Sequence, residues 1–436
     1  MSSKDIAILM ASYVPSQKKR LRLLVFVCAI SALVVGTVDL ANWPPLNLSR
    51  EIFYDQLTKH GRKTAPRNDL VFVGIDQSSL SLDPLWDDEK AAPFLSKIRD
   101  APGGWPWPRD VHAEIARRIL DAGAKVVLFD LIFSSPAEGD EALRELIENE
   151  PDRVLVAGSI MNTNEGERVE IQTAATTILP DLTTMDSRLG LVLVPAGAVE
   201  GGSRATIRKM RFRDSPLEHH SRSQELFKAE TIAETTYLTY PAQVLRILGR
   251  ESEVPKQAGD QFFRYLGLNH GIPMIPAYEV LFDGTLEGLK LNNVFKDKIV
   301  LVGPEAQTFH DYHPTPFDRM LGPVLILQQI AAALSGEYLV EPDITLRVIF
   351  LILTAGAAFA ICWWVGNPFI RVPLLLLLTA AWVPLAFFLF NHVAWMINAT
   401  APMAMLLAVG IAATVSDFVR SPGILGSGIM NHGCGT

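Results

Sequence analysis

The sequence has few cysteines, few charges and no excess of basic residues. Its three cysteines, among 436 residues, form no disulfide framework and match no zinc-binding spacing. Charged residues make up 20% of the chain, and 39 Lys and Arg stand against 47 Asp and Glu, which gives a net charge of −8. Because nucleic-acid binding needs a basic surface, no nucleic-acid partner is expected.

What the chain has in abundance is apolar residues. They make up 49% of the sequence, and the mean hydropathy is +0.22. A soluble protein of this size rarely has a positive mean, so membrane segments are expected. The length is sufficient for two or three domains.

Four apolar segments predict transmembrane helices, at 21–40, 348–365, 372–390 and 399–416. The first follows a basic cluster at 18–22, and Arg371 and Arg420 flank later segments, so both termini are expected in the cytoplasm. No clear signal-peptidase site follows residue 36, which favours an uncleaved anchor over a cleaved signal peptide. The remaining segments are then a cytoplasmic arm at 1–20, an extracytoplasmic domain at 41–347 and a short cytoplasmic tail at 417–436.

The segment 41–347 has the pattern of an α/β layered domain. Short, continuously apolar runs at 70–75, 126–129, 154–157, 191–194 and 298–302 predict strands buried on both faces of a mainly parallel sheet. Helical spacing appears at 110–122, 141–147, 242–248 and 323–334. The stretch 168–224 lacks periodic runs and is expected to be an irregular insertion or a long hairpin region.

Two carboxylates follow predicted strands. Asp76 ends the run 70–75, and Asp130 ends the run 126–129. Because ligand crevices lie at the carboxyl ends of parallel strands, adjacent strands would bring the two carboxylates together in a polar pocket. The alternative is that each Asp caps the turn or helix that follows it.

Two further clusters contain candidate ligand-binding residues. In Trp105-Pro-Trp-Pro-Arg109, Trp107 could stack a flat ligand and Arg109 could pair with an anion; the alternative is a loop that starts the next helix. In His310-Asp-Tyr-His313, Asp311 lies between two imidazoles, but such a short cluster has too few ligands for a metal site. Thr315 follows closely and is expected to border the same crevice. No metal and no cofactor are predicted.

Several blocks together resemble a known family. They are Val71-Phe-Val-Gly-Ile-Asp-Gln-Ser-Ser79, the block 105–109, Ala122-Gly-Ala-Lys-Val-Val-Leu-Phe-Asp-Leu-Ile-Phe133, Phe295-Lys-Asp-Lys-Ile-Val-Leu-Val-Gly303 and His313-Pro-Thr-Pro-Phe317. The chain resembles the extracellular sensory domain associated with cyclases and histidine kinases, CHASE family, type two. The resemblance covers about 49–340, with one span before it and three after. It implies a bacterial sensor in the inner membrane, with a small external ligand that is generally unknown.

The chain departs from this family in two places. After Gly322 the segment 323–329 is apolar and then amide, where relatives commonly have acidic and His residues. The last predicted span leads into a Gly-rich, uncharged tail rather than an output domain, which indicates either a sensor without its own output or a sequence truncated before one. We therefore expect a non-enzymatic sensor that signals through a membrane-protein partner or as a homodimer. The alternatives are a scaffold subunit of a membrane complex and an external metal-dependent hydrolase.

Overall fold

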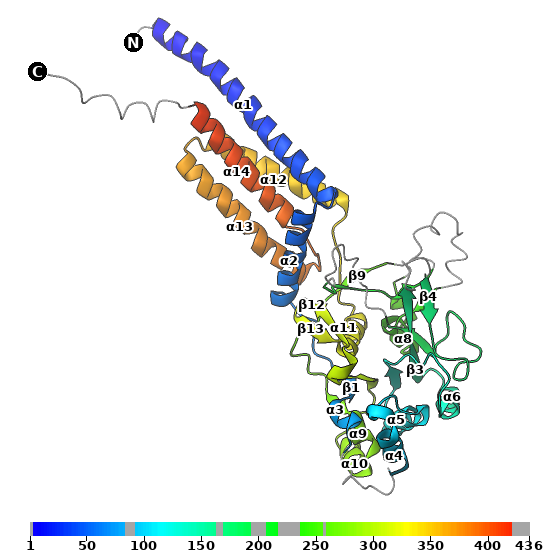
Figure 1. Ribbon diagram of the computed structural model, residues 1–436. Coiled ribbons are helices and arrows are strands. Elements are labelled where there is room, and N and C mark those ends of the chain that lie inside the picture. The colour runs from blue at the N-terminus through cyan, green and yellow to red at the C-terminus, as the bar shows by residue number, and fades with distance from the viewer. Residues whose placement is uncertain are drawn as a thin grey trace, which may run out of the picture. The chain divides into compact units, whose positions relative to one another are not determined.

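The computed structural model describes residues 3–82, 92–162, 169–192, 206–216, 236–255 and 259–420 (Figure 1). Contacts divide the chain into two compact units. One comprises 63–338 and is called the α/β unit; the other comprises 1–62 with 339–436 and is called the helical unit. The predicted boundaries of 41 and 347 for the extracytoplasmic domain stay a prediction.

A seven-stranded sheet forms the centre of the α/β unit. Its order is β10-β1-β11-β2-β3-β4, and β5 pairs with β3. Every pairing is parallel except that of β3 with β4. The bounds are β1 (Leu70–Ile75), β2 (Val126–Phe129), β3 (Val154–Asn162), β4 (Val169–Gln172), β5 (Leu189–Leu191), β10 (Met274–Pro276) and β11 (Ile299–Pro304). The predicted α/β class and its parallel strand pairing are confirmed.

Helices cover both faces of this sheet, which is why its strands are apolar throughout. One face packs against α4 (Ala92–Asp100), α5 (Arg109–Asp121), α6 (Asp140–Asn149), α9 (Ala277–Leu281) and α10 (Asp283–Leu291). The opposite face packs against α8 (Tyr240–Ile247) and α11 (Gly322–Ser335). Helices predicted at 110–122, 141–147, 242–248 and 323–334 thus correspond to α5, α6, α8 and α11.

Burial explains the apolar sequence of α11. Its residues from Gly322 to Leu334 are all buried, and the side-chain amide of Gln328 forms hydrogen bonds with the neighbouring main chain. Gln328 Oε1 accepts from the N–H of Leu266 at 2.8 Å, and Nε2 donates to the carbonyl of Gly267 at 3.0 Å. The apolar-then-amide segment after Gly322 therefore belongs to the core.

Shorter elements complete the α/β unit. They are α3 (Gln77–Leu80), three short helical turns at Pro102–Gly104, Glu251–Glu253 and Gln307–Phe309, the pair β12 (Tyr312–Thr315) and β13 (Asp318–Leu321), the pair β7 (Arg213–Asp214) and β8 (Tyr237–Leu238), and the small sheet of β6 (Lys209–Met210), β9 (Gln261–Phe263) and β14 (Tyr338–Leu339). The predicted irregular stretch 168–224 contains short strands where it is described, and 193–205 and 217–224 lie outside the described residues.

The helical unit contains α1 (Ser3–Leu40), α2 (Pro44–His60), α12 (Ile344–Trp364), α13 (Pro368–His392) and α14 (Thr400–Arg420). Three of its segments are long and apolar enough to cross a membrane: Leu21–Leu40, Ile344–Trp364 and Pro368–His392. The apolar stretch Thr400–Val415 is shorter, so three of the four predicted spans are supported in length and composition. The predicted tail is 417–436; its first four residues continue α14 to Arg420, and 421–436 lie outside the described residues.

A polar clasp joins the ends of three of these helices. The carboxylate of Asp39, at the end of α1, accepts hydrogen bonds from Arg347 Nη2 and, at 2.8 Å, from Asn398 Nδ2. The Asp39 side chain is only 6% exposed. On α2, a helix that the sequence patterns did not predict, the Tyr54 hydroxyl donates to Glu341 Oε1 at 3.0 Å. The connection into α12 is therefore tied to α1 and α2.

Candidate functional site

Three carboxylates follow three neighbouring strands at the carboxyl edge of the sheet. Asp76 follows β1, Glu305 follows β11 and Asp130 follows β2. Because β11 lies between β1 and β2, the expectation that Asp76 and Asp130 follow adjacent strands is wrong. At the usual strand spacing, β1 and β2 are about 10 Å apart.

Asp76 caps the helix that follows it. Its Oδ1 accepts from the N–H of Ser79 at 2.8 Å and from the Ser79 hydroxyl at 2.6 Å. The neighbouring Glu305 folds over Gly74, where an added Cβ would lie 1.8 Å from Glu305 Oε2. Burial, and then the charge of Asp76, raise the pKa of Glu305. Asp76 thus has the capping role that the sequence left as an alternative.

Asp130 lies close to Asp311 on the α11 side of the sheet. Burial, and then the Asp311 carboxylate, raise the pKa of Asp130 to about 8. Asp311 Oδ1 is 3.0 Å from His313 Nε2. Two of the predicted site residues are therefore electrostatic neighbours. In the described part of the chain, however, no three His, Cys, Asp or Glu side chains gather as a metal site would require.

Thr315 closes the hairpin between β12 and β13. Its hydroxyl donates to the carbonyl of Asp318 at 2.7 Å and accepts from the N–H of Phe317 at 3.1 Å. Phe317 packs against the core cluster on the α11 side of the sheet. The Thr315 side chain is buried and its hydroxyl is engaged in the turn.

Trp107 and Arg109 belong to the opposite, α5-covered face. Trp107 is 1% exposed, and its Nε1 donates to the carbonyl of Gly104 at 2.9 Å. The Arg109 guanidinium lies over the Phe133 ring at 4.6 Å, and its Nε is 3.7 Å from Asp140 Oδ1. Desolvation lowers the pKa of Arg109, partly offset by Asp140. The structure therefore separates these two residues from Asp130, Asp311 and Thr315.

Sequence patterns missed a buried histidine in this aromatic cluster. His112 is completely buried, stacks on Trp107 and meets the edges of Trp105 and Phe129. Neither of its ring nitrogens has a hydrogen-bond partner among the described residues. Burial, and then the charge of Arg109, lower the pKa of His112 to about 3. Its position on the apolar side of α5 was the available signal.

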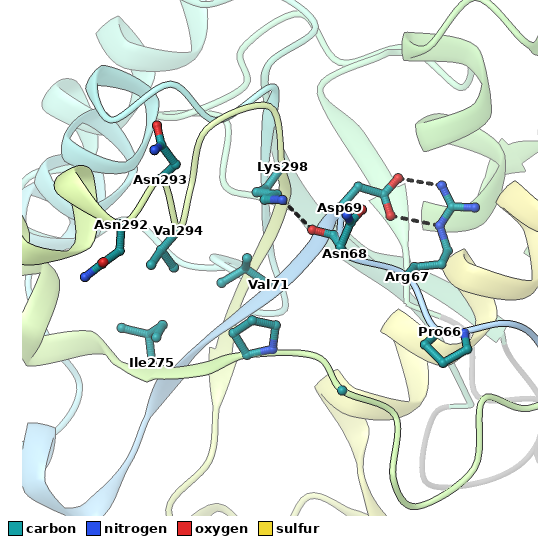
Figure 2. Close-up of a pocket in the computed structure, with 12 residues that line it drawn as sticks. Pro66, Arg67, Asn68, Asp69, Val71, Ile275, Asn292, Asn293, Val294 and Lys298 are labelled. Carbon is teal, nitrogen blue, oxygen red and sulfur yellow. Dashed lines mark hydrogen bonds and ion pairs between the residues drawn. The ribbon is translucent and has the colours of Figure 1, made fainter.

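A cavity lies at the other end of the sheet, where β1, β10 and β11 begin. This amino-edge pocket has a volume of about 780 Å³. Figure 2 shows Asn292, Asn293 and Val294 on one side, and Arg67, Asn68 and Asp69 on the other. Its lining residues are Pro66, Arg67, Asn68, Asp69, Val71, Gly271, Pro273, Ile275, Asn292, Asn293, Val294 and Lys298.

Polar contacts fix one wall of the amino-edge pocket. Asp69 holds Arg67 through two hydrogen bonds, of 2.8 Å to Nε and 2.5 Å to Nη2. The Lys298 ammonium donates to the main-chain carbonyl of Asn68 (Figure 2). None of these residues was singled out from the sequence, because reasoning from parallel sheets directs attention to carboxyl ends.

Comparison with known proteins identifies a family for this chain. A family profile described as the CHASE2 domain matches residues 24–365. Neither a curated protein nor a solved structure gives a significant match.

Proposed function

Because this chain belongs to the CHASE2 domain family, a family of extracellular sensory domains, we propose that it binds an external cue and signals through a separate protein. In this proposal the α/β unit is the sensor and the helical unit is the transmitter. The chain is then a receptor without catalytic activity of its own.

Chain connectivity is the observation that best supports this division of roles. The α/β unit begins three residues after α2 ends and finishes at Tyr338, six residues before α12 begins. Both of its ends therefore continue directly into the helical unit. Within that unit, Asp39 and Tyr54 bind the chain around the start of α12. A change of shape in the sensor would thus be delivered to α1, α2 and α12.

We further propose four spans in a bacterial inner membrane, with both termini in the cytoplasm and the α/β unit outside. The basic cluster at 18–22 supports this orientation, because basic residues favour the cytoplasmic side. In the helical unit, α14 packs against α1, α12 and α13, as a fourth member of the bundle would. This packing supports the proposal that α14 is the fourth span.

A movement of the helices becomes a signal only if another protein responds to it. A ligand shifts a conformational equilibrium only if its affinities for the two conformations differ. The protein that receives the signal must likewise bind the two helix arrangements with different affinities. The proposal assigns this role to a different membrane protein or to a second copy of this chain.

Isolation from the native membrane tests the proposal. The tagged full chain is cross-linked briefly, extracted in mild detergent and analysed for bound proteins, with an unrelated tagged membrane protein as the control. We expect a membrane protein enriched in a fixed ratio, or a dimer of the chain. A strictly monomeric chain that turns over a substrate by itself would contradict the proposal. A bound protein whose recovery is unchanged by every substitution in the α/β unit would favour a scaffold.

A further inference from the structure

We infer that the amino-edge pocket is the binding site for the cue, and that the cue is a small organic carboxylate. The inference rests on the proposed sensor function only in treating this ligand as a signal. The binding itself follows from the charge, lining and connections of the pocket.

The charge of the lining favours a ligand that carries a carboxylate group. Asp69 pairs with Arg67 through two parallel hydrogen bonds, so these two charges cancel within the pocket wall. Lys298 instead binds a carbonyl, which carries no formal charge. An ammonium has three donors, so two N–H groups of Lys298 remain for a ligand. The lining therefore carries one net positive charge on a group that can bind a carboxylate.

The remaining lining favours a short, partly apolar body. Ile275 and Val294 provide apolar surface between the polar walls (Figure 2). Pro273 also lines the pocket. The amide side chains of Asn68, Asn292 and Asn293 add hydrogen-bonding groups at the rim. A volume of about 780 Å³ falls within the usual range for small-molecule sites. A hydroxy acid or a short dicarboxylic acid combines these features.

The walls are fixed in place before any ligand binds. Arg67 is held both by Asp69 and, through Nη1, by the hydroxyl of Ser335 at 3.2 Å. Across the pocket, Asn292 Nδ2 donates to the carbonyl of Gly288 at 2.9 Å and closes the end of α10. Preformed walls reduce the entropy that a ligand loses on binding.

The pocket also has a route to the helical unit. Its first wall residue, Pro66, follows the end of α2 by only six residues, and the wall continues directly into β1. Through Asn68 and Lys298, that wall is joined to the beginning of β11 in the middle of the sheet. A carboxylate on Lys298 would therefore act on the segment that leads from α2 into the sensor.

Hydrogen exchange of the full chain in detergent tests this inference. The probes are sodium lactate and sodium succinate at about 50 mM, against sodium chloride and inorganic phosphate at equal ionic strength. For a dissociation constant of about 5 mM, exchange in the segments 66–71, 271–275 and 292–298 should slow roughly tenfold. Lys298→Met should abolish this protection, whereas Lys296→Met, which removes an exposed lysine outside the pocket, should preserve it.

Each alternative result has a defined meaning. Protection by phosphate but by neither carboxylate would overturn the ligand class, and protection that persists in Lys298→Met would overturn the site. No protection by either carboxylate in the native chain would reject the inference as a whole. These results leave the proposed sensor function intact, because that function is tested separately by orientation and by the protein that co-purifies.

Discussion

Replacing His112 by phenylalanine should remove a pH dependence from the stability of the α/β unit. His112 is fully buried and keeps a pKa of about 3 in the folded chain. In the unfolded chain a histidine has a pKa near 6.5. As the pH falls below 6.5, His112 becomes protonated in the unfolded state but stays neutral in the folded state. Folding is therefore destabilised by acid in the window from about pH 6.5 down to pH 3.

The magnitude follows from proton linkage. One proton of difference between the two states changes the free energy of unfolding by about 1.4 kcal/mol per pH unit. Between pH 7 and pH 5 the native chain should lose about 2 kcal/mol through His112. Asp130 acts in the opposite direction, because its raised pKa makes the folded state bind the extra proton as the pH falls from about 8. That contribution is present in both chains and cancels when they are compared.

At pH 7 the variant should also be at least as stable as the native chain. The two ring nitrogens of His112 are buried without a described partner, and a buried polar group without a hydrogen bond costs about 1–3 kcal/mol. Phenylalanine has a similar shape and suits a site bounded by Trp105, Trp107, Phe129 and Phe133. The overlap of the larger ring with its neighbours will offset part of this gain.

Urea unfolding of the full chain in mild detergent measures these effects, with tryptophan emission as the signal because Trp105 and Trp107 adjoin His112. Midpoints are compared at pH 7 and pH 5 for the native chain, His112→Phe and the control His310→Asn. His310 is exposed and has a φ of 52°, which asparagine accepts. Equal losses of stability in the native chain and His112→Phe would contradict this prediction, because they would mean that the folded state protonates His112 or provides it with a partner.

Three further changes test the packing. Gln328→Leu should destabilise the α/β unit by about 2–4 kcal/mol in the same urea assay, because it leaves a buried main-chain N–H and a buried carbonyl without hydrogen-bond partners. The control Gln329→Leu removes a buried amide nitrogen that has no described partner, and it should be neutral or stabilising. Gly74→Ala should cost about 1–3 kcal/mol through its clash with Glu305, and adding Glu305→Ala should restore most of the loss; no rescue would place the strain elsewhere. Asp39→Asn should lower the midpoint of thermal unfolding of the helical unit in detergent, since breaking a buried ion pair costs about 3–5 kcal/mol, and an unchanged midpoint would show that the clasp carries little energy.

Local patterns predicted the layers of the fold because burial determines them. Continuous apolar runs marked β1, β2, β3 and β11, and helical spacing marked α5 and α11, since each element is covered on the side or sides that its sequence indicates. Strand order did not follow. The strand β11 joins the sheet between β1 and β2 although it is 170 residues later than β2, and such long-range pairing leaves no local signal.

The candidate site shows the same limit. Asp76 and Arg109 occur at the predicted junctions of strands and helices, yet Asp76 is engaged in capping and Arg109 lies against an aromatic ring. The amino-edge pocket is assembled from three segments that begin different strands, and Lys298 becomes part of it only through the pairing of β1 with β11. Residues that are brought together by strand pairing, and are far apart in the sequence, cannot be identified from sequence motifs.

The side of the membrane on which the α/β unit lies decides whether this unit can bind an external cue. Leu291 is 80% exposed in that unit, and Phe369 is 87% exposed at the start of α13, on the side assigned to the cytoplasm. In a chain whose cysteines are replaced by serine, Leu291→Cys and Phe369→Cys are treated with a membrane-impermeant maleimide on intact cells whose outer layer is permeable to the reagent. If the α/β unit lies outside the cytoplasm, Leu291→Cys should be labelled at once and Phe369→Cys only after the membrane is opened. Labelling of Leu291→Cys only after opening would place the α/β unit in the cytoplasm and contradict an extracellular sensor.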